Sequence, residues 1–403
     1  MSKQNGAAVL ATVLMVVMLA VLMRAYGERA SIRKNHYQAS HRQSLAFARD
    51  ALIDFAVNYP SHYADRSAGP GHLPCPDRNG NGSPSLGCGG LAIGFLPVDF
   101  GTGENKNISL LERQAVTGEP LWYVVSSAFR NNPAPNGSTE HNNIVNSDTR
   151  GELQLDEEPE IIALLIAPGP ALAGQDRSDS VNVADYLEGE NADGDYAFAH
   201  GQGNDRILAI RWQDLMPLVE RRVLAAARDI IENYRTDHGH MPWLAELQQP
   251  MQLGDSTCVP CQWEGLIATE RYYNSRAWPE YHMQSCVDTT TSAEHEQATP
   301  VLPIWFASNY WHRHVWMHLE SDERGGLCPL LPAPVFEQQP VSAVIVSTGR
   351  ALLNPQHGKA PQDREPTPAL NSHLDHSLWV DGDGSYPALK QTEGVNDQWS
   401  TLP

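Results

Sequence analysis

Three acidic segments hold the residues best suited to bind a metal ion. In the first, Asp77, Asn79 and Asn81 occupy alternate positions of the string DRNGNG, which matches the first half of an EF-hand-like calcium loop. The twelfth position of such a loop should be a bidentate Glu, and it is Cys88 here. We therefore expect an incomplete calcium site, a calcium site completed by residues from elsewhere, or a polar turn.

The other two acidic segments combine carboxylates with glycine. Their acidic residues are Glu188, Glu190, Asp193, Asp195, Asp381 and Asp383. Alternating oxygen donors beside glycine suit calcium, which is the one cofactor that the sequence suggests. Solvated turns that follow strands are the alternative for both segments.

The cysteines suggest disulfide chemistry. There are six of them: Cys75, Cys88, Cys258, Cys261, Cys286 and Cys328. An even number behind an apolar N-terminal segment favours disulfides in an oxidising compartment. Cys75 and Cys88 would close a short loop, and the pairing of the other four stays open. Zinc is the competing interpretation, because Cys258 and Cys261 have CxxC spacing, but a second close pair is missing.

Two further patterns are weak candidates for catalysis. His314 and His318 have the spacing of one helical turn and lie close to His312, but their aromatic neighbours favour packing over metal binding. A Gly-Asp-Ser string begins at Gly254 and lacks the pattern of a nucleophile elbow. The sequence contains no phosphate-binding glycine loop. We therefore expect a protein that is not an enzyme.

The overall charge excludes one class of partner. The chain has 28 basic and 48 acidic residues, for a formal net charge of -20. Nucleic-acid binding needs clustered Lys and Arg, so we expect no nucleic-acid partner. The acidic balance fits a solvated surface.

The elements that position these residues begin with an apolar N-terminal segment. Seventeen residues without a charge, Ala7 to Met23, follow a polar hexapeptide that ends at Gly6. As a helix this segment would span roughly 26 Å, close to the ~30 Å hydrocarbon core of a bilayer. Apolar residues then recur at helical spacing: Leu45, Ala48, Leu52, Phe55 and Ala56. We expect one helix that continues to about Tyr59, with a transmembrane start and an amphipathic end.

This N-terminal pattern resembles that of type IV prepilins: a short leader with Lys3 that ends in Gly6, then Ala7 and an apolar helix. The resemblance implies that prepilin peptidase cleaves between Gly6 and Ala7, that Ala7 is then methylated, and that the helix packs among other pilins or pseudopilins. It also implies a single-pass inner-membrane precursor with its bulk in the periplasm, followed by a pilus, a pseudopilus or the cell surface.

Two residue patterns qualify the resemblance. Most pilins have Glu at mature position 5, where this chain has Ala11. The resemblance implies the same absence in the tip-type pseudopilin of type II secretion, which binds calcium, and in some minor pilins. A tip position is therefore favoured over the filament shaft. The basic flank after the apolar segment would by itself place that flank in the cytoplasm. Its residues are Arg24, Arg29, Arg33 and Lys34.

The chain also repeats itself. The string ARDALIDFAVNYP at Ala48 is echoed by ARDIIENYRTDHG at Ala227, and ALLIAPGPAL at Ala163 by AVIVSTGRAL at Ala343. GHLP and GHMP, the blocks PLWYVVSSA and PIWFASNYW, and the two later acidic loops follow in the same order. Five echoes in one order favour a tandem duplication.

The duplication predicts the domain organisation. We expect a leader at 1–6, the stem helix at 7–59, a first head at 60–212 and a second, divergent head at 213–403. The second head would contain a cysteine-bearing insertion near 250–298 and open with a helix from Leu215 to Tyr234.

Each head should combine one helix with a small sheet. Strands are expected at Leu121–Val125 and Ile161–Ala167 in the first head, and at Ile304–Ala307 and Val341–Val346 in the second. The predicted fold class is α+β: a long N-terminal helix packed on a pilin-like head, with a second soluble copy of the head.

The function that fits these observations is structural. We expect a minor, low-copy pilin or pseudopilin subunit at a filament tip, which initiates or caps the filament and contacts other subunits or a target. A membrane-anchored periplasmic protein that binds its target in a calcium-dependent way, outside any filament, is the alternative.

Overall fold

The computed structural model describes the greater part of the chain. The described residues are 15, 17–19, 23–24, 41–62, 68–85, 88–98, 119–131, 143–178, 181–245, 261–273, 279–283, 301–321, 328, 330–350, 385–386 and 398–402. The predicted processing site at Gly6 and Ala7, and Ala11 with it, lies outside these residues.

The first large sheet is antiparallel and is buried on both faces. Its strands, in spatial order, are β1 (Ala92–Phe95), β2 (Trp122–Val125), β5 (Ala163–Ala167) and β7 (Arg206–Ile210). Successive side chains of a strand point to opposite faces. Tyr123 and Val125 therefore enter the core that contains the helices, whereas Trp122 and Val124 enter a second core on the other side.

A small sheet covers that second face. It consists of β4 (Glu158–Ile161), β3 (Leu153–Leu155) and β6 (Ala197–Phe198), with β3 and β6 parallel. Leu153, Leu155 and Phe198 pack against the tryptophan face of the large sheet. Because both faces are covered, the strands are continuous apolar runs rather than alternating ones.

The C-terminal half contains a second pair of sheets. The large one has the order β17 (Gln398–Leu402), β15 (Ala343–Ser347), β12 (Val315–Leu319) and β8 (Glu264–Leu266). The small one has the order β14 (Gln339–Pro340), β13 (Val335–Phe336) and β16 (Ser385–Tyr386). A separate hairpin sheet contains β11 (Val301–Leu302), β10 (Pro279–Met283) and β9 (Thr269–Tyr273).

The two pairs of sheets have the same topology. In chain order, β1 corresponds to β8, and β2 to β7 correspond to β12 to β17. Each pair of neighbouring strands has the same direction in both sets: β3–β6 and β13–β16 are parallel, and the other pairs are antiparallel. This equivalence supports the predicted tandem duplication. It also places β8, which lies in the segment predicted to be an insertion, inside the second sheet.

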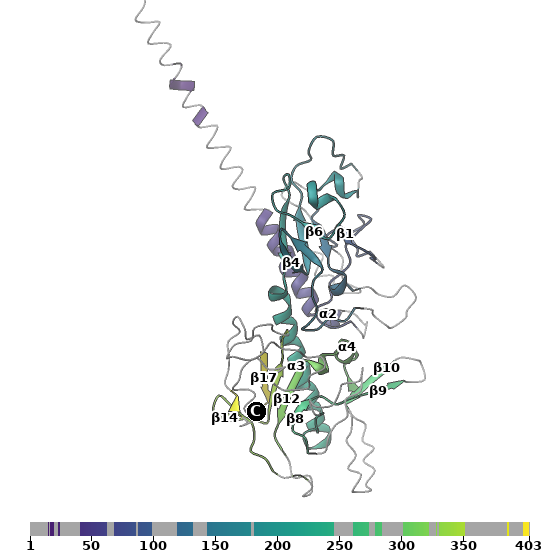
Figure 1. Cartoon of the computed structure of the whole chain (residues 1–403), viewed down its shortest axis with the longest axis vertical. Helices are drawn as coiled ribbons and strands as arrows, with labels where there is room; N and C mark the ends of the chain where they lie inside the picture. The colour runs from purple at the N-terminus through teal and green to yellow at the C-terminus, as the bar shows by residue number, and fades with distance from the viewer. Residues whose placement is uncertain are drawn as a thin grey trace, which may run out of the picture.

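Two long helical segments lie next to each other (Figure 1). Residues 41–57 are helical and are followed by α2 (Tyr59–His62), and α3 runs from Trp212 to His238. Figure 1 shows α3 extending from the first group of strands to the second. The predicted helix Leu215–Tyr234 is thus confirmed, and its predicted apolar face is buried: Val223, Ala226, Ala227, Ile230 and Tyr234.

Side chains and backbone geometry set both ends of α3. At the N-terminus the backbone N–H of Arg211 donates to Asp214 Oδ2 at 2.9 Å. At the C-terminus Gly239 adopts φ 73° and its N–H donates to the carbonyl of Arg235 at 2.8 Å. Both contacts satisfy backbone groups that the helix itself leaves free.

The predicted fold class is wrong for the described residues. Strands β1 to β17 form five sheets and dominate the structure, the helices are few, and the described N-terminal residues contain no long apolar helix. Short apolar runs pair with one another as antiparallel strands, so the structure contains more strands than the sequence predicted. The 41–57 helix is amphipathic, with Asp50 and Asp54 exposed.

The predicted inner-membrane location is also corrected. Within the residues that the structure describes, no helix combines the length and the apolarity needed to cross a bilayer. The uncharged run from Ala7 to Met23 was expected to form the transmembrane start of the helix. Most of this run lies outside the described residues.

One of the four predicted strands is wrong. The segment predicted as Ile304–Ala307 is the helix α4 (Ile304–Ser308), and the equivalent of β2 is β12 at Val315–Leu319. The other three predicted strands contain β2, β5 and most of β15. Trp305 and Phe306 of α4 are buried, so their aromatic rings serve the core as those of β2 do.

Candidate functional site

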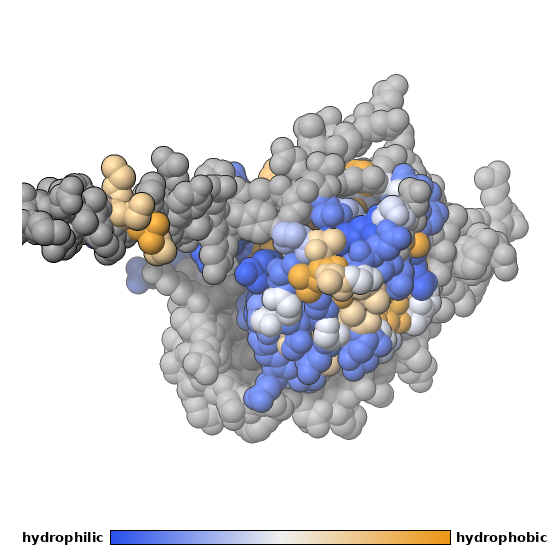
Figure 2. Space-filling model, turned by 90° about the horizontal axis from the view of Figure 1, so that it is seen from above, coloured by the Kyte–Doolittle hydropathy of each residue, from blue (hydrophilic) through white to orange (hydrophobic). Residues whose placement is uncertain are grey.

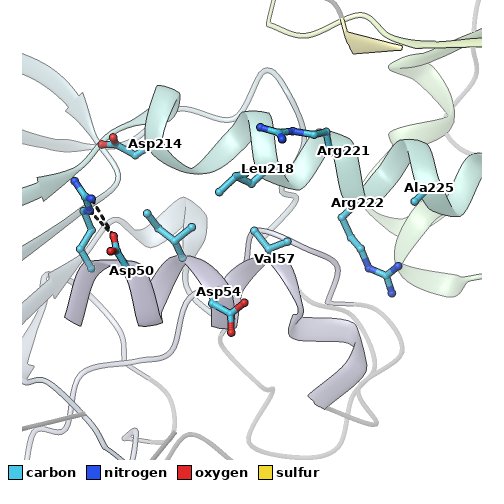
Figure 3. A pocket seen from close by; sticks show the side chains of 10 residues that line it. Asp50, Asp54, Val57, Asp214, Leu218, Arg221, Arg222 and Ala225 are labelled. Carbon is cyan, nitrogen blue, oxygen red and sulfur yellow. Dashed lines mark hydrogen bonds and ion pairs between the residues drawn. The ribbon is translucent and has the colours of Figure 1, made fainter. Parts of the chain in front are cut away.

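A concave cleft lies between the two long helices. It has a volume of about 720 Å³ and is lined by the 41–57 helix on one side and α3 on the other. Val57 and Leu218 lie between the helices, where Figure 3 shows them pointing toward each other. Ile53 and Ala225 complete an apolar floor.

Charged residues border this floor. On the 41–57 helix, Asp50 accepts two hydrogen bonds from Arg49, at 2.9 and 3.0 Å, so this pair is internally neutral. Asp54 is exposed and accepts only from the neutral side-chain amide of Asn58, at 2.9 Å. Within the described part of the chain, Asp54 therefore forms no ion pair at this wall of the cleft.

The opposite wall, formed by α3, is basic. Arg221 is exposed, and its Nε donates to the carbonyl of Pro217 at 3.3 Å. The Nε of Arg222 is buried and has no hydrogen-bond partner in the described part of the chain. Neither guanidinium forms an ion pair with a carboxylate there, so the cleft has one acidic and one basic wall.

The acidic loop at Glu188 is built around a buried carboxyl group, that of Asp205. Asp205 is only 3% exposed. Its Oδ2 accepts from the N–H of Glu188 and from Nδ2 of Asn191, both at 3.1 Å. Its Oδ1 is buried without a hydrogen-bond partner among the described atoms. The loop thus covers a carboxyl group of which, among the described atoms, only one oxygen accepts hydrogen bonds.

This environment changes the protonation of Asp205. Burial raises the pKa of Asp205 to about 7, and the neighbouring Glu188 carboxylate adds to the increase against the opposing hydrogen bonds. The Glu188 carboxylate is held in place by Nε2 of Gln175 at 3.1 Å and by the N–H of Asn204 at 3.0 Å. Two facing carboxyl groups, one of them buried, are more stable when they share a proton.

The other predicted acidic ligands mainly close turns. Oδ1 of Asp193 accepts from the N–H of Asp195 at 3.2 Å, and Oδ1 of Asp195 accepts from the N–H of Ala197 at 2.7 Å. Glu190 lies in a short 3₁₀ helix, Gly189–Ala192. Asp381 and Asp383 lie outside the described residues.

The loop at Asp77 is organised in the same way. Asp77 is buried, its Oδ1 accepts from the N–H groups of Asn79, Gly80 and Asn81, and its Oδ2 accepts from Gly82 at 2.6 Å. Asn79 and Asn81 also accept backbone N–H groups. Side-chain oxygens that accept nearby backbone N–H groups in this way are typical of a polar turn, which was the alternative to a calcium loop. No group of three or more His, Cys, Asp or Glu side chains placed to hold a metal occurs in the described part of the chain, and calcium binding stays a prediction.

The disulfide prediction is confirmed in part. Cys75 pairs with Cys88, as expected, and Cys261 pairs with Cys328. Because the sulfur of Cys261 is bonded to Cys328, a zinc site built on the CxxC pair is excluded. Cys258 and Cys286 lie outside the described residues.

The histidine cluster serves packing. His314 caps a short 3₁₀ helix and His318 lies on β12, so the two are not one helical turn apart. Nδ1 of His318 is 3.1 Å from Oε1 of Glu264 on the adjacent strand β8. Burial lowers the pKa of His318 to about 4 and raises that of Glu264. Near neutral pH the histidine is uncharged, and the contact is a hydrogen bond rather than an ion pair.

A buried glutamate connects the two heads. Glu220 of α3 is fully buried and accepts from Ser147 Oγ of the first head and from Gln398 Nε2 of β17, both at 2.8 Å. Nearby, the N–H of Val145 donates to Oδ1 of Asn309 at 2.9 Å, which also crosses between the heads. The heads are therefore fixed to each other by specific polar contacts.

Sequence reasoning missed Asp205, Glu220 and the cleft. A signal existed for Glu220, because it lies on the apolar stripe of its helix between Met216 and Val223, where a charge is unexpected. Asp205 directly precedes an apolar strand, which is a weaker signal. The cleft had none, because it depends on how two helices some 160 residues apart pack together.

The described surface of the first head, seen from above, contains few apolar side chains (Figure 2). Figure 2 shows that the described surface is mainly hydrophilic there, with a small hydrophobic cluster enclosed by polar residues. The exposed large apolar residues of the loops in this head include Leu172, Val181 and Tyr196. A small exposed apolar cluster of this kind is normal on a protein surface and defines no site.

Comparison with protein-family models, with curated proteins and with solved structures finds no match to this chain. The functional assignment therefore depends on its own residues.

Proposed function

We propose that this protein is a low-copy structural subunit of a type IV pilin-like or pseudopilin-like assembly, with a binding role and no catalytic step. The observation that carries the proposal is the N-terminal sequence MSKQNG followed by Ala7 and an uncharged run. A leader that ends in Gly6 is the pattern that prepilin peptidase cleaves, and the cut leaves the apolar segment on the product.

Two features of the described residues support a binding role. The two pairs of sheets of like topology are joined across α3 by hydrogen bonds to Glu220, and together they form an extended body (Figure 1). The cleft between the 41–57 helix and α3 offers an apolar floor with charged borders, which is a usual composition for a protein-binding surface. The partners in this proposal are prepilin peptidase and other pilin-like subunits.

Processing provides the test. We expect that mass spectrometry of the protein, produced together with a prepilin peptidase, finds a mature N-terminus at Ala7. Gly6→Ala should abolish this cleavage, whereas Gly27→Ala, a glycine of the same N-terminal region, should leave it unchanged. A mature N-terminus elsewhere, or normal cleavage of the Gly6→Ala variant, would overturn the proposal.

A further inference from the structure

The cleft between the 41–57 helix and α3 has a charge distribution that is complementary to itself. One wall presents Asp54, and the other presents Arg221 and Arg222. When such a surface is rotated by 180° about an axis through its centre, the acidic wall of one copy faces the basic wall of the other. This is the requirement for an interface with two-fold symmetry, in which the same patch is used by both subunits.

The remaining charges of the cleft do not oppose this arrangement. Asp50 is neutralised by Arg49, and Asp214 accepts the N–H of Arg211 at the start of α3. Among the described residues, the charges left without an ionic partner are therefore Asp54 on one wall, and Asp214 with the two arginines on the other, so the α3 wall keeps a positive balance. A chain with a net charge of -20 repels its own copies in general, so self-association needs a local patch where opposite charges meet.

The apolar floor gives such a contact its favourable area. Ile53, Val57, Leu218 and Ala225 line the cleft, and covering them removes apolar surface from water. The guanidinium of Arg222, which forms no ion pair among the described residues, would gain one from an incoming carboxylate. We propose that this cleft is the interface of a two-fold symmetric dimer, and that its occupant is a second copy of this chain. The inference is independent of the proposed function.

A charge exchange tests the dimer on the full chain. Sedimentation equilibrium should find a concentration-dependent dimer for the native protein. In a two-fold dimer the contact between residues 54 and 222 occurs twice. Asp54→Arg alone and Arg222→Glu alone each make both contacts repulsive, and each should weaken dimerisation about tenfold or more. An equimolar mixture of the two variants should restore dimers to within about threefold of the native affinity, because both contacts then pair opposite charges.

The mixture separates this interface from other effects. A variant that failed to fold would not be rescued by its partner, and association through the apolar N-terminal segment would not respond to the charge exchange. Glu232→Arg, at an exposed position of α3 away from the cleft, is the matched control and should leave the dimer intact. A native protein that is monomeric up to about 100 μM, single variants that still dimerise, or a mixture without recovery would each overturn the proposal.

Discussion

At the scale of single residues, Asp205 is a buried carboxyl group whose pKa is raised to about 7. A carboxyl group that is 3% exposed, with one oxygen unpartnered and Glu188 beside it, holds its proton more tightly than it does in the unfolded chain. The native state therefore binds more protons than the unfolded state between about pH 4 and pH 7. Stability from this group is fully present below about pH 4 and is lost as the pH rises to 7.

Asp205→Asn should remove this pH dependence. The asparagine keeps an oxygen for the N–H of Glu188 and adds donors toward the Glu188 carboxylate. We expect the variant to gain about 2 to 4 kcal/mol relative to the native protein between pH 4 and pH 8, measured by urea unfolding at both pH values. Asp193→Asn removes the same charge at an exposed position and should show no such gain. An equal effect of the two substitutions would contradict this account.

Several described residues that the sequence singled out for their chemistry have structural contacts. Asp77 and Asp195 accept backbone N–H groups in turns, and His318 is an uncharged hydrogen-bonding residue of a strand. The alternation of oxygen-bearing residues with glycine is shared by calcium loops and by polar turns, so residue types alone could not separate the two. The difference lies in where each oxygen points, which the folded loop decides.

At the scale of elements, the C-terminus of α3 isolates one backbone effect. Gly239 has φ 73°, a left-handed conformation, and a Cβ placed there would meet no atom within 4 Å. Gly239→Ala should therefore lower the free energy of unfolding by about 1 kcal/mol through backbone strain alone, measured by denaturant unfolding.

A second glycine provides the control for Gly239. Gly89 also has open space around a built Cβ but does not require a positive φ. Gly89→Ala should leave the free energy of unfolding within about 0.5 kcal/mol of the native value. If both substitutions had the same effect, the left-handed cap would not be the cause.

Elements with strong local periodicity could be predicted from sequence. The apolar stripe of α3 is such a case, because the helix period selects which side chains share a face. Strand β5 was predicted instead from a short apolar run that ends before Pro168. The segment Ile304–Ser308 could not be predicted in this way. Its short apolar run has neither a helical nor a strand period. The sequence likeness to the block at Pro120 also misled the prediction, because the aromatic residues of that block lie on strand β2, whereas Trp305 and Phe306 lie on a helix.

At the scale of the whole molecule, Glu220 couples the two heads. Removing its carboxylate leaves Ser147 and Gln398 without their buried acceptor, and leaves a cavity in α3. We expect Glu220→Ala to lower the free energy of unfolding by about 2 to 4 kcal/mol, and to broaden or split the unfolding transition in calorimetry. Glu232→Ala, exposed on the same helix, should change neither. A native-like transition in Glu220→Ala would mean that the heads are coupled in another way.

The sequence by itself determined the features that depend on neighbouring residues. The internal echoes, the buried face of α3, strand β5 and the Cys75–Cys88 pair follow from local spacing and short loops. The tertiary structure alone decided that β8 joins the second sheet, that Cys261 pairs with Cys328, that Asp205 is buried, and that Asp54 and Arg222 border one cleft. These facts join residues far apart in the chain, and their positions are set by the packing of helices on sheets rather than by any local period.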